Sequence, residues 1–399
     1  MKGGEQPAFV GIPAGWRGNA SRVVLVGGAP LMALMFAALG PVLPSMAEHF
    51  GGRTGGAFAA QMILTMPAIG VILGGLAGGL AVERWGPRPV MIGALIGYGL
   101  LGVSGYFIED LPLLLVSRFL LGFCVAHVAT AIGVIVGAWF EGVARARLLG
   151  YQSAVAGFFA VSGLLLSGVL AEAGGWRAPF LLYLFAFVVL GFVIGGLPRG
   201  VGRTVRAEKR ESLRPLAGLW PIYALAMFLF VGYFMTSIQL SFLLAEDGVD
   251  SPLVRSMVIA TGVLAGGIFG GCYGRFYAWL GERGVQIFLT AMLATGLTVI
   301  GFSSDVWMLA LGAFLSGGGG GMIPPHISGI LLGRVPAALR ARAIGLEFTV
   351  LYLADFVNPL VMTPLRAAVG IHTAFLVMAA TLFFAAGAMW LRRQRQLRL

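Results

Sequence analysis

The glycine-rich stretch GGLAGG at residues 74–79 recurs as GGIFGG at residues 266–271, 192 positions further along the chain. Two further pairs of similar stretches follow in the same order, each with an offset of 195 positions. They are FLLG at 119–122 with FLSG at 314–317, and RARLLG at 145–150 with RARAIG at 340–345. Chance alone does not explain three pairs in order at consistent offsets. The chain is therefore predicted to contain two parallel repeats of similar length.

The amino-acid composition indicates a membrane protein. Hydrophobic residues make up 58% of the 399 residues and charged residues only 11%, with a mean hydropathy of +0.92. Soluble proteins are closer to half apolar and about a quarter charged, so a water-soluble protein is excluded. The net charge of +11 does not indicate nucleic-acid binding, because the basic residues lie in short loops between apolar segments.

Twelve segments are long and apolar enough to cross a bilayer, which needs about 20 apolar residues per helix. The predicted spans are 22–47, 55–82, 89–108, 111–140, 148–171, 178–197, 218–245, 254–280, 285–303, 306–333, 343–366 and 372–391. Together with the repeats, they predict an all-α polytopic membrane protein with two six-helix pseudo-repeats.

The distribution of Lys and Arg predicts the orientation. With both termini in the cytoplasm, 22 of the 27 basic residues are cytoplasmic, 4 lie on the other side, and Arg118 lies within a span. Cytoplasmic loops are enriched in Lys and Arg, so we expect cytoplasmic termini and location in a bacterial inner membrane. The expected domains are a cytoplasmic N-terminus (1–21), an N-terminal bundle (22–197), a cytoplasmic linker (198–217), a C-terminal bundle (218–391) and a cytoplasmic tail (392–399).

The loop after the second predicted span reads GLAVERWGPR at residues 79–88. It resembles the signature loop between helices two and three of the major facilitator superfamily, which has a glycine, three variable positions, an acid, an arginine, one position, a glycine and two basic residues. The matching positions are Gly79, Glu83, Arg84, Gly86 and Arg88. Pro87 stands where the family has the first of the two closing basic residues.

Two shorter motifs are similar to those of the drug:proton antiporter branch of this superfamily. They are SRFLLG at 117–122 in the fourth span and GPVLP at 40–44 in the first. The resemblance implies a major facilitator fold, alternating access and proton-coupled export. The branch also carries a Gly-Pro pair in helix five, where this chain has Gly163-Leu164, and this difference leaves the direction of transport open.

The charged loop is expected to act as a conformational gate. Its carboxylate and guanidinium groups can pair with one another, with Glu141 after the fourth span, or with a helix end of the opposite half. Pairs that break and re-form as the halves rock would set the balance between the two conformations. The predicted gate residues are Gly79, Glu83, Arg84, Gly86, Arg88 and Glu141. The alternative is a solvated loop that only fixes the topology.

Asp355 is the acidic residue that lies far from either predicted membrane face. It is about 20 Å from Arg342 and about 16 Å from Arg366 along a helix that rises 1.5 Å per residue. A carboxylate at this depth costs several kcal/mol unless it is neutralised or faces a watery cavity. We expect Asp355 to take up and release the coupled proton. The alternative is a structural carboxyl bonded to a neighbouring helix.

Arg118 lies about 10 Å into the fourth span at 1.5 Å per residue. It could extend outward to the membrane surface, or face the cavity and bind a carboxylate or polarise a proton site. His127 is nine residues further on and points about 180° away on an ideal helix. The two side chains therefore cannot both face the cavity squarely, and the motif favours Arg118.

Further substrate-binding candidates are polar residues inside the spans. His326 follows the glycine run 317–321 and the pair Pro324-Pro325, a stretch that is not expected to form a regular helix. Broken helices at membrane depth line protein or a cavity, although a lone histidine is often only packed. The remaining candidates are Gln152, Tyr233, Gln239 and Asn358. Interhelical hydrogen bonding is the alternative for each.

An enzyme is not expected, because the four histidines are dispersed and the sequence contains no His-Glu-x-x-His motif or glycine-rich phosphate loop with a lysine. No cofactor or metal is expected either. The predicted function is a secondary active transporter for a small organic or amphipathic molecule, with proton-coupled export. Uptake of a small organic anion such as a carboxylate, and a transporter-like receptor or scaffold, remain alternatives. The expected partners are the substrate, protons and membrane lipids, with no nucleic acid, and the protein is expected to be a monomer.

Overall fold

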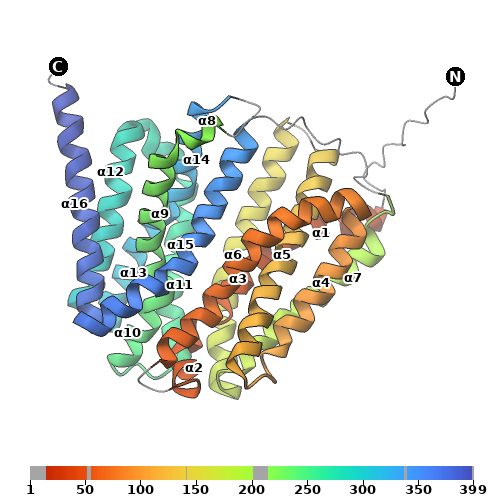
Figure 1. Cartoon of the computed structure of the whole chain (residues 1–399), viewed down its shortest axis with the longest axis horizontal. Coiled ribbons are helices and arrows are strands. Elements are labelled where there is room, and N and C mark those ends of the chain that lie inside the picture. The colour runs from red at the N-terminus through yellow and green to blue at the C-terminus, as the bar shows by residue number, and fades with distance from the viewer. Residues whose placement is uncertain (1–14, 52–54, 141, 201–213, 337–338, 398–399) are drawn as a thin grey trace. The chain divides into compact units, whose positions relative to one another are not determined.

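The computed structural model describes residues 15–51, 55–140, 142–200, 214–336 and 339–397, and the structural statements below refer to these residues. They form helices, and no strand occurs among them (Figure 1). The longer helices are α1 (Gly15–Ala37), α3 (Gly56–Trp85), α4 (Pro87–Ser104), α5 (Leu111–Trp139), α6 (Gly142–Gly174), α7 (Phe185–Gly196), α9 (Trp220–Phe234), α11 (Pro252–Gly271), α12 (Tyr273–Phe302), α13 (Val306–Gly321), α14 (Ile323–Arg334), α15 (Arg340–Val369) and α16 (Ile371–Leu397). The shorter segments are the 3-10 turns Gly40–Val42 and Ala178–Leu184, α2 (Leu43–His49), α8 (Arg214–Ala217), the π-helical turn Met235–Gln239 and α10 (Leu240–Glu246).

Eleven helical segments of the described chain are long and apolar enough to cross a membrane. The remaining predicted span corresponds to α4, which has 18 residues. Its first turn contains Pro87, Arg88 and Pro89, which lower its hydropathy. Each of the twelve predicted spans thus has a helical counterpart, and the predicted all-α membrane fold is confirmed.

Two glycines with positive φ mark equivalent breaks in the two repeats. Gly86 (φ 84°) separates α3 from α4, and Gly281 (φ 70°, ψ 174°), 195 positions later, interrupts α12. Glycine tolerates this left-handed region because it has no Cβ. The predicted span 254–280 is therefore corrected, because its helix α11 ends at Gly271 and the rest forms the first part of α12.

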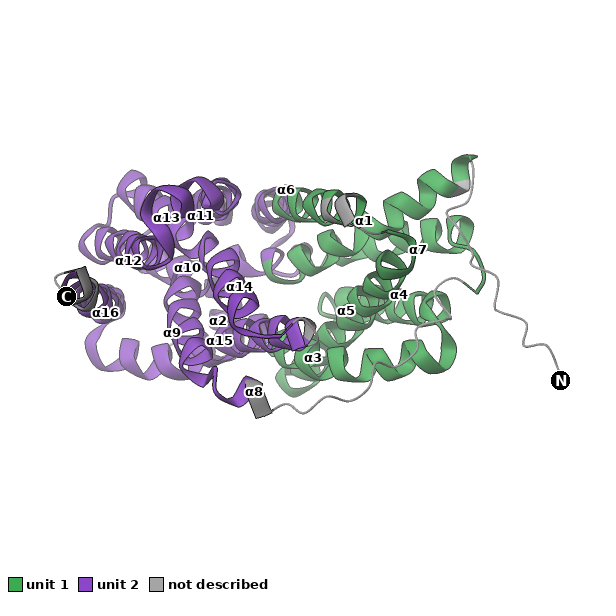
Figure 2. Cartoon of the chain, turned by 90° about the horizontal axis from the view of Figure 1, so that it is seen from above, with its two compact units in different colours: residues 1–36, 66–159, 180–209 green, residues 37–65, 160–179, 210–399 purple. Residues whose placement is uncertain are grey.

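The chain divides into two compact units (Figure 2). Unit 1 comprises residues 1–36, 66–159 and 180–209, and in it α4 packs on α5 and α7. Unit 2 comprises residues 37–65, 160–179 and 210–399, and in it α11 and α12 pack on α13, α12 packs on α16, and α15 packs on α9.

Unit 2 therefore includes two segments of the expected N-terminal bundle. The first is held in unit 2 partly by Ser241, which donates to the carbonyl of Pro41 at 3.4 Å. The second is held partly by Ser251, which donates to the carboxylate of Glu172. The expected bundle boundaries, 22–197 and 218–391, stay a prediction.

Glycines allow the same helix crossing in both units. A Cβ at Gly74 would lie 2.6 Å from the carbonyl oxygen of Phe123 on α5, and a Cβ at Gly270 would lie 2.8 Å from that of Gly321 on α13. Any side chain would prevent these approaches, so α3 packs on α5, and α11 on α13, through small residues. Among the described residues, no atom lies within 4 Å of a Cβ at Gly75, Gly79, Gly267 or Gly271. Close packing thus involves one of the two glycine faces of each helix.

Candidate substrate and coupling site

A π-helical turn interrupts the helix that runs from α9 to α10. It spans Met235–Gln239 and buries Thr236 and Gln239. Such turns add a residue to the helix and are frequent at functional sites. The hydroxyl of Thr236 lies 2.8 Å from that of Ser316 on α13, so the turn directs a polar side chain into the interior of unit 2.

Gln239 connects two other buried amides. Its Nε2 donates to Oε1 of Gln61 on α3 at 2.9 Å and to Oδ1 of Asn358 on α15 at 3.1 Å. Thr363 donates to the same oxygen of Gln61 at 3.3 Å. The Nδ2 of Asn358 donates to the carbonyl of Val231 on α9 at 2.9 Å. Three helices of unit 2 thus meet in one amide cluster, made of Gln61, Gln239 and Asn358.

The amide cluster has unused hydrogen-bonding capacity. Nε2 of Gln61 and Oε1 of Gln239 are buried and have no partner among the described residues. Leaving such a group unpaired costs about 1 to 3 kcal/mol. Because one atom is a donor and the other an acceptor, the cluster can bind a neutral polar group of a ligand.

Asp355 lies one helical turn before Asn358 on α15 and is 2% exposed. Its Oδ2 is a further buried atom without a partner in the described part of the chain. The structure thus joins two predicted substrate-binding residues, Asn358 and Gln239, and Asn358 lies one helical turn from the predicted coupling residue Asp355.

The other predicted residues of the second half are packed. A Cβ on Gly320 would overlap the ring of Tyr233, so this ring fills the space beside the glycine run of α13. His326 is fully buried, and its Nδ1 lies 3.2 Å from the hydroxyl of Tyr273. The glycine run 317–321 is helical, and the helix is interrupted at Met322, where α13 ends and α14 follows.

Arg118 in unit 1 caps a helix. It is fully buried and donates through Nη2 to the carbonyls of Leu101 and Gly102. These belong to the last turn of α4, where carbonyls have no helical donor and a cation is favourable. The guanidinium also lies over the rings of Phe180 and Tyr183, at 5.0 and 5.1 Å. It does not extend to the surface.

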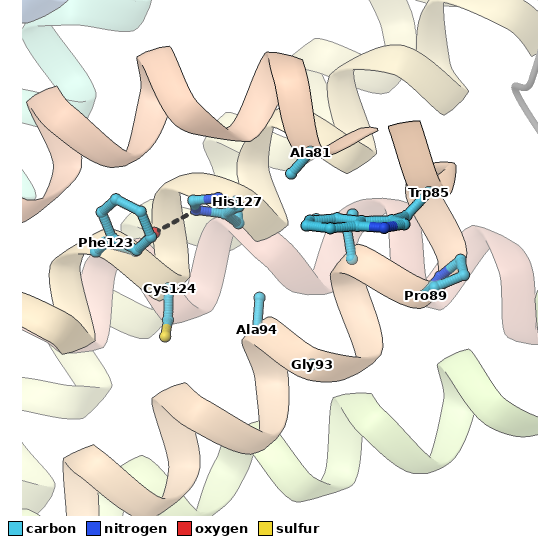
Figure 3. A pocket seen from close by; sticks show the side chains of 9 residues that line it. Ala81, Trp85, Pro89, Gly93, Ala94, Phe123, Cys124 and His127 are labelled. Carbon is cyan, nitrogen blue, oxygen red and sulfur yellow. Dashed lines mark hydrogen bonds between the residues drawn. The ribbon is translucent and has the colours of Figure 1, made fainter. Parts of the chain in front are cut away.

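A pocket of about 340 Å³ in unit 1 lies between α3, α4 and α5. Figure 3 shows His127 and the indole of Trp85 in this pocket, with Ala81 between them on α3. Nδ1 of His127 lies 2.8 Å from the carbonyl oxygen of Phe123. His127 and Arg118 thus occupy different surroundings, as ideal helix geometry predicts.

The predicted gate residues are only partly brought together. Arg88 donates to the carbonyl of Ile194 at 3.0 Å and so caps α7. Glu83 is exposed, and the exposed Arg84 lies over the ring of Trp85 at 5.6 Å. Gly86 forms the turn described above, and a Cβ at Gly79 would meet no described atom. Glu141 lies outside the described residues.

Gln152 donates to the carbonyl of Leu25 on α1 at 2.7 Å, so it joins two helices of unit 1. Two polar residues of unit 2 are missing from the sequence-based prediction. Gln61 is an amide within an apolar span, and this signal could have indicated it. Glu347 is 3% exposed and accepts a hydrogen bond from Ser328 at 2.6 Å; its position near a predicted span end concealed it.

Comparisons with known proteins agree with this architecture. Residues 25–286 match the Major Facilitator Superfamily. A puromycin resistance protein of Streptomyces alboniger is 30% identical over 264 residues, which are 61% of this chain and half of that protein. The class G tetracycline resistance protein of Vibrio anguillarum is 26% identical over 378 residues, covering 88% of this chain and 91% of the relative. A crystal structure of the nucleoside transporter NupG superposes with a TM-score of 0.74 at 13% identity, covering 92% and 98% of the two chains. This chain belongs to the major facilitator superfamily and is an integral membrane transporter, not an enzyme.

Proposed function

We propose that the protein exports a small organic or amphipathic molecule by alternating access, in exchange for protons. The observation that carries this proposal is the amide cluster of Gln61, Gln239 and Asn358 one turn from the buried carboxyl of Asp355. It combines a ligand-binding group and a titratable group within unit 2. The names of the two resistance proteins support export of drug-like compounds.

The amide cluster is suited to substrates with a neutral polar group. The unpartnered donor of Gln61 and acceptor of Gln239 can bond a hydroxyl, a carbonyl or an amide. Apolar residues make up most of the surrounding core of unit 2, so the rest of the substrate is expected to be apolar.

Asp355 is proposed as the group that exchanges the proton. The unpartnered Oδ2 is consistent with a carboxyl whose partner changes during the cycle. An ion deep in a membrane protein is costly unless it pairs or is neutralised, and protonation is the simplest neutralisation. Substrate binding at the neighbouring amides can then be coupled to the charge of Asp355.

We also propose that the protein lies in the inner membrane of a bacterium with both termini in the cytoplasm, and that it works as a monomer. The positive-inside distribution of Lys and Arg supports the orientation. The alternative of organic-anion uptake needs a cation near the substrate. Arg118 is the candidate in unit 1, because its Nη1 is buried without a partner among the described residues, although its Nη2 bonds to the end of α4.

The test is transport by purified protein in proteoliposomes with an imposed pH gradient. Tritiated tetracycline and puromycin are the first probes, because the two relatives are named for resistance to them. An antiporter accumulates substrate in vesicles with an acidic lumen, whichever way the protein is inserted. Accumulation driven by an alkaline lumen would instead favour uptake with protons. Saturable binding without flux under either gradient would favour a receptor.

A further inference from the structure

We propose that Glu347 is a second proton-carrying residue, which accepts the proton from Asp355 and passes it to the cytoplasm. This proposal rests on the proposed function, because it needs proton-coupled transport. It adds a residue that lies outside the motifs of the chain.

Glu347 and Asp355 share one face of α15. They are eight residues apart, which separates them by about 12 Å along the axis and about 80° around it. Asn358 is only about 20° from Glu347 in the same projection. All three side chains are at most 3% exposed. The buried face of α15 therefore carries a row of polar groups from the amide cluster toward Arg342.

Glu347 lies between Asp355 and the proposed cytoplasmic end of α15, so a proton can cover this distance in two shorter steps. In the proposed topology Arg342 marks the cytoplasmic end of α15. Glu347 is about 8 Å from that end, whereas Asp355 is about 20 Å away. A proton that leaves Asp355 for the cytoplasm would otherwise cross the whole distance in one step. Glu347 is the carboxyl group that α15 offers between the two.

Glu347 lies in the part of unit 2 where α9, α14 and α15 lie side by side (Figure 2). From α14, the hydroxyl of Ser328 donates to Oε2 of Glu347 at 2.6 Å. A hydroxyl can donate to the ionised carboxylate, and it can accept from the protonated carboxyl. From α9, the phenol of Tyr223 donates to the carbonyl of Ala343 at 3.2 Å, one turn before Glu347.

The remaining titratable groups near Glu347 come from two helices. On α14, His326 is two residues before Ser328 and is engaged with Tyr273. On α15 itself, Arg342 precedes Glu347, and Tyr352 and Asp355 follow it. Ser328 is the partner bonded directly to the carboxyl, so it is the group that should tune its titration.

The proposed step is a proton transfer through water that enters when this end of unit 2 opens. The O–H bond at Asp355 breaks and an O–H bond at Glu347 forms, so the negative charge moves from Glu347 to Asp355. Glu347 then releases the proton to the cytoplasm, and Asp355 is ready for the next proton from outside.

The test compares Glu347→Gln with wild type in two measurements. In proteoliposomes, we expect gradient-driven accumulation of tritiated tetracycline or puromycin to be at least about tenfold slower, with exchange of substrate at equal pH unchanged. In pH-difference infrared spectra of the purified protein, we expect the carboxyl C=O signal of Glu347 to disappear. The matched control is Glu282→Gln, because Glu282 is an exposed acid that pairs with Arg334 at 3.6 Å; it should behave as wild type in both measurements.

Two results would overturn the assignment. One is gradient-driven transport by well-folded Glu347→Gln at the wild-type rate, and the other is an unchanged carboxyl spectrum. If Glu347→Gln does not fold, Glu347→Asp and Ser328→Ala replace it. The proposal would be overturned if, in both variants, the pH dependence of transport and of the carboxyl signal is unchanged. Wild-type transport that ignores the pH gradient would refute the proposed function itself, so the two failures are distinguishable.

Discussion

Polar side chains of the two units have different kinds of partners. In unit 1, arginines bond to the last carbonyls of helices, with Arg118 at the end of α4, Arg88 at the end of α7 and Arg145 at the end of α5. In unit 2, several polar side chains bond to other side chains. These pairs are Gln61 with Gln239, Gln239 with Asn358, Thr236 with Ser316, and Ser328 with Glu347.

We infer that the two kinds of hydrogen-bond partner serve different purposes, one the stability of the fold and the other transport. A helix end always needs its carbonyls satisfied, so an arginine that caps a helix cannot leave without destabilising it. Side chains that bond to one another can exchange a partner for a substrate or a proton, while the backbone stays intact. We therefore expect a variant of the buried Arg118 in unit 1 to change mainly stability, and variants of the amide cluster in unit 2 to change mainly transport.

The largest effects should come from the helix crossings, where the two units are alike. A Cβ at Gly122 would overlap the carbonyl of Pro67, and one at Gly317 would overlap that of Gly262. Gly122→Ala and Gly317→Ala should each lower the free energy of unfolding by about 3 kcal/mol or more, because the backbones must separate. Gly75→Ala and Gly267→Ala, where no described atom lies within 4 Å, should be neutral. The measurement is the Tm and the yield of monodisperse protein. Equal Tm values for all four variants would contradict the close helix packing at Gly122 and Gly317.

A middle-sized effect should distinguish the capping arginine from the amide cluster. Arg118→Met removes the donors of two carbonyls at the end of α4 and should lower the stability by about 2 to 3 kcal/mol, with the KM of transport unchanged in the protein that folds. Gln239→Met should raise the KM about tenfold, equivalent to about 1.4 kcal/mol, with a smaller loss of Tm. The reverse pattern, in which Arg118→Met raises the KM and Gln239→Met only lowers the Tm, would contradict the different roles inferred for Arg118 and the amide cluster.

The buried face of each helix was the hardest feature to predict from the sequence. Most spans are apolar on all sides, so no amphipathic stripe shows which glycines face a neighbour. The sequence does not distinguish Gly74 from Gly75, yet among the described residues only Gly74 of the two lies against another helix. The depth of Asp355, in contrast, followed from counting residues between charged ends, and the structure shows it buried.

The partners of the polar residues depend on contacts that no local pattern reveals. Gln61 and Gln239 are 178 positions apart, and the π-helical turn places Gln239 in the interior of unit 2. Arg118 was predicted to extend outward or to face a cavity, because the sequence does not show that α4 ends beside it. The depth of a charged residue within a span could thus be predicted from the sequence. Its role could not, because the role depends on which helix ends lie beside it.

The smallest effect is expected at the charged loop of unit 1. Glu83→Gln and Arg88→Ala should shift the equilibrium between conformations by about 1 to 3 kcal/mol, with Arg88→Ala giving the larger shift because it also frees the carbonyl of Ile194. Distances between spin labels on the proposed cytoplasmic face report the shift. Unchanged distances in both variants would indicate that the loop only fixes the membrane topology.

The central claim is that Asp355 couples substrate movement to protons, and Asp355→Asn tests it most directly. Asn keeps the shape and hydrogen-bonding reach of the side chain but does not titrate. In proteoliposomes with and without a pH gradient, we predict that the variant loses gradient-driven accumulation of the transported probe and retains binding and exchange. Undiminished uphill transport by a well-folded Asp355→Asn protein would contradict the account and remove Asp355 from the mechanism.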